Sequence, residues 1–126
     1  MILLDTNIVI DMINNEDDSH WNLLQQDSVV LCGIVITELY RGIKNTKEEK
    51  AVELFVNSID SLPLQNNDWK QIGLFIAKLR DSGLIVPVQD AIISYLAIKY
   101  NCSVCTNDNH FRIIKAADEK LQLITE

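Results

Sequence analysis

The chain has 126 residues, of which 48% are hydrophobic and 23% charged, and its formal net charge is −7. This length suffices for a hydrophobic core, and the composition excludes a disordered chain, so we expect one domain over residues 1–126. No apolar run approaches the roughly 20 residues of a membrane span. No basic segment precedes the first apolar run, so we expect a cytoplasmic protein. The acidic balance argues against nucleic-acid binding by bulk electrostatics alone.

The three cysteines are odd in number and do not predict a disulfide framework. Cys102 and Cys105 have CxxC spacing, but this stretch is interpreted as a helix end that runs into a strand. There is no second CxxC to complete a zinc site. We therefore expect reduced, structural thiols.

The N-terminal segment predicts a buried strand followed by a helix. Ile2–Leu4 shows no polar alternation, as is typical of a parallel strand covered on both faces. Asp5, Thr6 and Asn7 come next, and the apolar run 8–13 then predicts a short, mostly buried helix. Asp5 or Thr6 could simply cap this helix. Alternatively, Asp5 stands at the carboxyl end of a first strand, where α/β folds place their ligands.

The middle of the chain alternates between predicted strands and helices. Ser19 is predicted to cap a helix through residue 24, residues 29–32 form a strand, and Thr37 caps a helix with Glu38 in its first turn. Gly42 ends that helix. A longer helix begins at Thr46, and a short strand broken by a proline follows at 61–64.

The last third continues the alternation. Asn67 or Asp68 is predicted to cap a helix that ends at residues 82–83. Pro87 suits the first turn of the next helix, which places Asp90 near its N-terminus. Residues 103–106 predict a strand, 106–111 a polar turn, and 121–125 an edge strand. The whole pattern predicts a three-layer α/β/α sandwich on a mainly parallel sheet.

Four carboxylates, those of Asp5, Glu38, Asp90 and Asp108, fall at strand ends or helix starts. Singly, each has a plain structural interpretation as a cap, a helix-dipole partner or a turn former. Together they would meet at one edge of the sheet, where their repulsion requires a cation. Oxygen ligands favour Mg²⁺ or Mn²⁺. Such ions support phosphodiester hydrolysis by activating water and stabilising the leaving oxygen.

The supporting residues at this edge are expected to be Thr6, Asn7 and Thr106, which flank the acids and could orient them or the attacking water. Neither histidine is interpreted as a general base: His20 lies in an acidic loop, and His110 is a single residue close to Asp108.

Four segments of the chain resemble, in order and spacing, the acidic motifs of PIN-domain ribonucleases, and most nearly those of VapC toxins. They are LLDTNIVID, ITELYRG, VPVQDAIISYLAIKYN and TNDNHF. The resemblance implies that Asp5, Glu38, Asp90 and Asp108 bind metal, with Thr6, Asn7 and Thr106 in support. The fourth acid, which corresponds to Asp108, is the most variable one in the family.

The resemblance also implies a PIN-like fold and Mg²⁺- or Mn²⁺-dependent cleavage of RNA, commonly tRNA or rRNA. It further implies a cognate VapB-type antitoxin, whose C-terminal segment wraps the toxin and often sends a basic residue into the acidic site. A homodimer or a toxin–antitoxin hetero-oligomer is the expected assembly. The acidic net charge suits a basic partner.

Two alternatives stand beside this hypothesis. A non-catalytic PIN-like binding module would be expected to lack one or more of the acids, and all four are present. A metal-dependent phosphatase usually has a second acid two residues after its aspartate nucleophile. Here that position is Asn7, and no obvious phosphate-binding lysine follows a later strand.

Overall fold

The centre of the protein is a five-stranded sheet, described here from a computed structural model that covers residues 1–124. All four strand pairs are parallel, and the spatial order is β3-β2-β1-β4-β5. The strands are β1 (Ile2–Leu4), β2 (Val29–Cys32), β3 (Asp60–Leu62), β4 (Ser103–Cys105) and β5 (Gln122–Ile124). This arrangement confirms the predicted parallel sheet.

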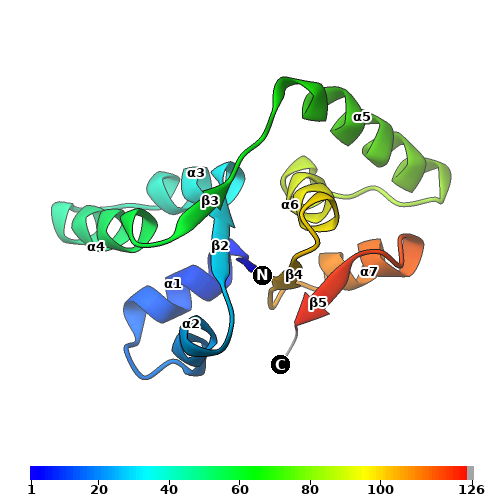
Figure 1. The fold of residues 1–126 in the computed structure, drawn as a ribbon. Coiled ribbons are helices and arrows are strands. Elements are labelled where there is room, and N and C mark those ends of the chain that lie inside the picture. The colour runs from blue at the N-terminus through cyan, green and yellow to red at the C-terminus, as the bar shows by residue number, and fades with distance from the viewer. Residues whose placement is uncertain (125–126) are drawn as a thin grey trace.

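Helices cover both faces of the sheet and complete the predicted α/β/α sandwich (Figure 1). One side carries α1 (Thr6–Asn14), the 3₁₀ helix η1 (Ser19–Asn22), α2 (Leu23–Gln26), α3 (Gly33–Arg41) and α4 (Thr46–Asn57). The other side carries α5 (Asn66–Asp81), α6 (Val88–Lys99) and α7 (His110–Ala117).

The strand order reverses beside β1. The chain first runs from β1 through β2 to the edge strand β3, and then crosses back to β4 and β5 on the other side of β1. In open α/β sheets, such a switch point leaves a crevice at the carboxyl ends of the two strands that flank it. Here those strands are β1 and β4, which end at Leu4 and Cys105.

The core explains why β1 lacks polar alternation. Leu3 and Leu4 are completely buried because β1 has a strand on either side and helices above and below it. Ile2 lies opposite Val29 on β2 and Ser103 on β4. A central parallel strand has no solvent face, so every position favours an apolar side chain.

Two predicted helix starts on the first side are wrong. The helix that holds Glu38 begins at Gly33, four residues before Thr37, and the Thr37 hydroxyl instead donates to the Gly33 carbonyl at 2.8 Å. Glu38 therefore lies in the second turn. The cap of η1 is Asp18, whose carboxylate accepts the His20 N–H at 2.8 Å, and not Ser19. Gly42 does end α3, as predicted.

Two helix starts on the second side also differ. Gln65 precedes α5, and Asp68 lies in its first turn, where its carboxylate accepts the Gln65 N–H at 2.8 Å. Neither Asn67 nor Asp68 is the cap. Pro87 precedes α6 instead of lying in its first turn, although Asp90 does lie there. The predicted polar turn 106–111 is interrupted at its end by α7, which begins at His110.

The remaining boundaries agree closely. The strand predicted at 61–64 occupies Asp60–Leu62, and that predicted at 103–106 ends at Cys105. The last strand begins at Gln122 and is described to Ile124; Thr125, part of the predicted strand, lies outside the described residues. Within residues 1–124, no helix has the length and apolar character needed to cross a membrane. The three cysteines are buried thiols, not disulfides.

The helices of residues 46–82 contribute both to the core and to the surface. Val52, Phe55, Ile72 and Leu79 are buried, whereas the side chains of Leu54, Trp69 and Leu74 are exposed.

The buried carboxylate of Asp68 joins α5 to α6, because it accepts hydrogen bonds from the Tyr95 hydroxyl at 2.7 Å and the Lys99 ammonium at 2.8 Å.

Candidate functional site

Asp5 stands at the switch point, directly after β1. Its backbone N–H donates to the Cys105 carbonyl at 2.9 Å, which extends the pairing of β1 with β4 by one residue. The residue is only 6% exposed, and its carboxylate accepts two hydrogen bonds, from the Thr6 N–H at 2.8 Å and from the Thr106 hydroxyl at 2.7 Å. Asp5 thus caps α1, as one interpretation held, and its carboxylate is also bonded to Thr106, which follows β4.

Glu38 reaches the same edge from α3. The Thr6 hydroxyl donates to one of its carboxylate oxygens at 3.0 Å, so α1 and α3 are joined beside Asp5. The other oxygen faces the guanidinium of Arg41 at 3.8 Å, on the exposed side of α3. Glu38 is therefore oriented from the protein side by a hydroxyl and approached from the solvent side by a cation.

Asp108 and Asp90 complete the acidic group. The Asp108 N–H donates to the Thr106 hydroxyl at 2.9 Å, so a single threonine connects the first and the fourth acid. Asp90, in the first turn of α6, and Asp108 both lie beside His110. The His110 Nδ1 atom is 3.0 Å from an Asp90 oxygen and 3.3 Å from an Asp108 oxygen.

All four predicted acids are therefore brought to one edge, together with Thr6 and Thr106. Asn7 is exposed in the first turn of α1, and its side chain does not join the hydrogen bonds described above. His110 was not among the predicted site residues. The sequence signal that could have indicated His110 is its position two residues after Asp108, in the segment that follows β4.

The electrostatics of the site reflect burial and mutual repulsion. Burial raises the pKa of Asp5, against the lowering effect of its hydrogen bond from Thr106. Burial, assisted by the charge of Asp108, raises the pKa of Asp90 to about 6. The Asp5 charge raises the pKa of Asp90 further, so the acids act on one another as a group. A site in which carboxylates are both desolvated and crowded favours a bound cation.

The donor set fits a hard divalent cation. Asp90, Asp108 and His110 each offer one atom, and these three atoms lie within 4.8 Å of one another among the described residues. The carboxylates of Asp5 and Glu38 add further oxygen donors at the same edge. Carboxylate oxygens are the usual protein ligands of Mg²⁺ and Mn²⁺.

Replacing Asp90 by asparagine is expected to stabilise the metal-free protein at pH 7.5 by on the order of 1 kcal/mol. The folded carboxyl has a pKa of about 6, above its usual value. Its ionisation therefore destabilises the folded state, and this effect develops as the pH rises from about 4 to 6 and is complete above 6. Urea unfolding in EDTA at pH 4.5 and 7.5 measures it.

The control for this experiment is Asp17→Asn, which removes an exposed carboxylate in the loop before η1. It should leave the free energy of unfolding nearly unchanged at both pH values. Equal free energies of unfolding of the Asp90→Asn and wild-type proteins at pH 7.5 would show that the charge of Asp90 does not destabilise the folded protein.

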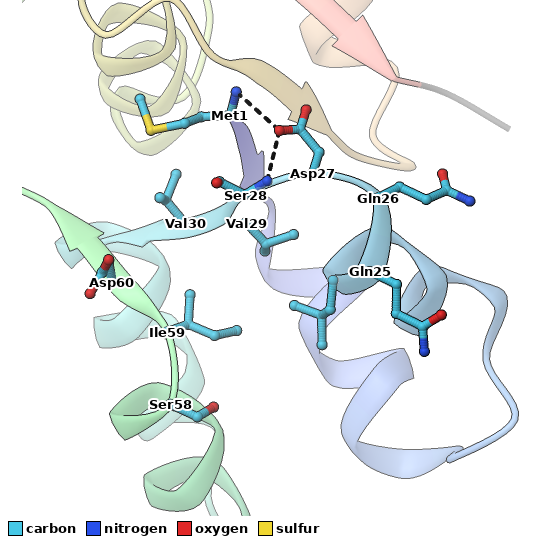
Figure 2. A pocket seen from close by; sticks show the side chains of 11 residues that line it. Met1, Gln25, Gln26, Asp27, Ser28, Val29, Val30, Ser58, Ile59 and Asp60 are labelled. Carbon is cyan, nitrogen blue, oxygen red and sulfur yellow. Dashed lines mark hydrogen bonds and ion pairs between the residues drawn. The ribbon is translucent and has the colours of Figure 1, made fainter.

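The opposite edge of the sheet has a hollow of different character (Figure 2). It lies where β1, β2 and β3 begin, and it carries the two carboxylates of Asp27 and Asp60. One Asp27 oxygen already accepts the Ser28 N–H at 2.7 Å and lies 3.7 Å from the N-terminal amine of Met1. The group of four acids lies instead at the carboxyl ends of the strands, where α/β sheets generally place their ligand sites.

The sequence model of the PIN domain family matches residues 2–117. The chain therefore belongs to the PIN domain family.

Two relatives match most of the chain, and solved structures match nearly its full length. Ribonuclease VapC2 of Rickettsia felis is 26% identical over 114 residues, which cover 84% of this chain and 85% of that protein. The plasmid stability protein StbB of Pseudomonas syringae pv. tomato is 28% identical over 124 residues, or 86% of this chain and 88% of that protein.

The fold is similar to that of a protein in the crystal structure of VapBC2 from Rickettsia felis bound to a DNA fragment from their promoter. The TM-score is 0.82 and the identity 25%, with 99% of this chain and 98% of that chain covered. A chain of VapBC-1 from nontypeable Haemophilus influenzae has a TM-score of 0.80 at 23% identity, with the same coverage. The second likeness concerns the fold alone.

Proposed function

We propose that this protein is a Mg²⁺- or Mn²⁺-dependent endoribonuclease that acts as the toxin of a toxin–antitoxin pair. The observation that carries the proposal is the meeting of Asp5, Glu38, Asp90 and Asp108 at the switch point of a PIN fold. The similarity of this chain to a relative named as a ribonuclease supports the proposed reaction class. Substrates such as tRNA or rRNA belong to the proposal.

In the proposed mechanism, Asp5, Glu38, Asp90 and Asp108 would hold the divalent cation, which when bound would supply Lewis-acid activation of the phosphate and of water. The chain itself provides position and charge. The Thr106 hydroxyl and the Thr6 N–H donate to the two oxygens of Asp5 at 2.7 and 2.8 Å, and each of these oxygens keeps a further lone pair for a ligand. The Thr6 hydroxyl orients Glu38 in the same way, at 3.0 Å.

Preorganisation is the main contribution of these threonines. Both threonines are buried; Thr6 begins α1 just after β1, and Thr106 directly follows β4. Carboxylates that are fixed before the substrate arrives need little reorganisation as charge develops on the phosphate. Asn7 is proposed as a supporting residue that reaches the substrate from its exposed position on α1.

The purified protein is expected to cut a labelled RNA in Mg²⁺ or Mn²⁺ and to stop when EDTA is added. Restoring either cation should restore cleavage. A phosphomonoester, offered in parallel, should not be turned over. Cleavage that persists in EDTA would contradict the proposed mechanism, and turnover of the monoester with intact RNA would favour a phosphatase. Absence of both cleavage and calorimetric metal binding would favour a non-catalytic binding module.

We further infer that a cognate antitoxin binds this chain, because two of the similar structures are described as VapBC assemblies. A groove between α1, α3 and α4 is lined by apolar side chains that include Ile10, Ile13, Leu39 and Val52. An amphipathic antitoxin segment would cover this groove with its apolar face. A basic residue at the end of that segment would offset the acids beside Glu38, in keeping with the net charge of −7.

The expected assembly is a homodimer or a toxin–antitoxin hetero-oligomer. Exposed apolar side chains on the two sides of the sheet, Leu54 on α4 and Trp69 and Leu74 on α5, provide area for separate contacts of this kind. A cytoplasmic location is part of the same proposal.

A further inference from the structure

His110 lies against two of the proposed metal ligands, although neither the acidic motifs nor the proposed mechanism gives it a role. Its Nδ1 atom is 3.0 Å from Asp90 Oδ2 and 3.3 Å from Asp108 Oδ1. Asp90 is carried by α6, whereas Asp108 and His110 come from the segment between β4 and α7. The contact between the ring and Asp90 therefore depends on the packing of α6 against α7.

The ring is held in position without being buried. The backbone N–H of His110 donates to Asp108 Oδ1 at 2.9 Å, which fixes the start of α7. The next residue, Phe111, is completely buried and anchors the helix to the core. The imidazole itself is half exposed, so it can adjust to a ligand without disturbing the fold.

The spacing of these three atoms suits a metal ion. Adjacent ligands of an octahedral ion with bonds of roughly 2.1 Å are about 3 Å apart, which is the bond length multiplied by √2. The two distances from Nδ1, 3.0 and 3.3 Å, are of this size. In the metal-free protein the shorter one is a hydrogen bond between the ring and Asp90, so binding of the ion requires that Nδ1 carry no proton. One atom from each of Asp90, Asp108 and His110 lies within 4.8 Å of the other two, so the three atoms can face one ion.

We propose that His110 is a nitrogen ligand of the divalent ion that Asp90 and Asp108 hold, and that it makes this site select Mn²⁺ over Mg²⁺. The inference rests on the proposed function, since it requires that the acidic cluster bind a divalent ion. It goes beyond it in naming a fifth residue of the centre and in choosing between the two cations.

The choice of cation follows from the donor chemistry. Mg²⁺ is a hard ion that favours oxygen and keeps several of its waters, so an imidazole adds little to its binding. First-row transition ions accept imidazole readily, and their affinity for mixed nitrogen and oxygen sites rises along the series from Mn²⁺. One nitrogen among carboxylates therefore increases the affinity for Mn²⁺ more than that for Mg²⁺.

The test combines a spectroscopic and a thermodynamic measurement on three full-length proteins: wild type, His110→Ala and Asn109→Ala. Asn109 is the exposed neighbour that precedes α7, and its side chain makes no capping hydrogen bond, so it controls for changes in the loop. Pulsed electron paramagnetic resonance of bound Mn²⁺ detects imidazole nitrogen through its ¹⁴N coupling. Calorimetry gives the affinities for Mn²⁺ and Mg²⁺, and circular dichroism checks folding.

The ¹⁴N coupling is expected in the wild type and in Asn109→Ala, and it should be lost in His110→Ala. The Mn²⁺ affinity of His110→Ala should fall about tenfold, the lower end of what the loss of a metal-site interaction causes. Its Mg²⁺ affinity should change much less.

Three results would overturn the inference. If the wild type binds Mn²⁺ without a ¹⁴N coupling that depends on His110, or if both affinities fall equally in His110→Ala, the imidazole is not a selective ligand. Metal binding by the acids, and with it the proposed function, then still stands. If the wild type binds neither cation, the proposed function and the inference fail together.

Discussion

Asp5→Asn is expected to lower the rate of metal-dependent RNA cleavage by on the order of 10³-fold, because electrostatic stabilisation by a bound metal is worth several kcal/mol. Asp5 is the most enclosed of the four acids and stands at the switch point between β1 and β4. Asparagine keeps an oxygen that can accept from the Thr6 N–H but removes the charge. The fold should therefore persist while the metal affinity is lost. Initial cleavage rates in Mg²⁺ and Mn²⁺ measure the effect.

The matched control is Asp11→Asn, which makes the same chemical change on the exposed side of α1, six residues further along. Its cleavage rate should remain near that of the wild type. A similar loss in both variants would point to a general charge effect, and a near-normal rate in Asp5→Asn would remove Asp5 from the metal site.

Phe111→Ala is expected to reduce the free energy of unfolding by about 3–5 kcal/mol, the usual effect of emptying a large aromatic site in a core. Phe111 is completely buried and lies in the first turn of α7. The cavity would lie directly below the segment that carries Asp108 and His110. Urea unfolding followed by circular dichroism measures the change.

For comparison, Ile113→Ala removes a side chain from the same helix that is 45% exposed. Its effect should be well below that of Phe111→Ala, since truncations at partly exposed positions leave no closed cavity. If the two substitutions destabilise the protein equally, α7 is not anchored through Phe111 but held by its whole length.

The strands and the acidic cluster were predictable from the sequence for a physical reason. A parallel strand buried on both faces is a short, uninterrupted apolar run, and Ile2–Leu4 and Val29–Cys32 are of this kind. An acid at the end of such a run is conspicuous, so Asp5 could be singled out. The order and spacing of the other motifs then added Glu38, Asp90 and Asp108.

Helix starts were less predictable because capping signals compete. Thr37 has the side chain of a good cap, yet its hydroxyl bonds to the Gly33 carbonyl within α3. A helix can begin directly at a strand end without a capping side chain, as α3 does after Cys32. Which alternative holds depends on tertiary packing, and this is not encoded in the local residue pattern.

His110 could not be assigned from the sequence because its contact with Asp90 is visible only in the folded structure. It is 20 residues from Asp90 in the chain, and only the packing of α6 against α7 brings the ring and that carboxylate to 3.0 Å. The motif around Asp108 shows a histidine nearby but not which way it faces. The acids could be found as a group of like residues, whereas a lone imidazole has no such partners in the sequence.

The bond between Thr106 and Asp5 joins residues that are 101 positions apart. The two residues of this bond are therefore synthesised far apart in time. When the ribosome has synthesised the first 102 residues, Asp5, Glu38 and Asp90 are already present, but the second neighbour of β1 is not. Thr106 and Asp108 arrive with β4 and the turn that follows it. The acidic group therefore cannot be assembled before β4 and the turn after it have been synthesised, because Thr106 and Asp108 both follow β4.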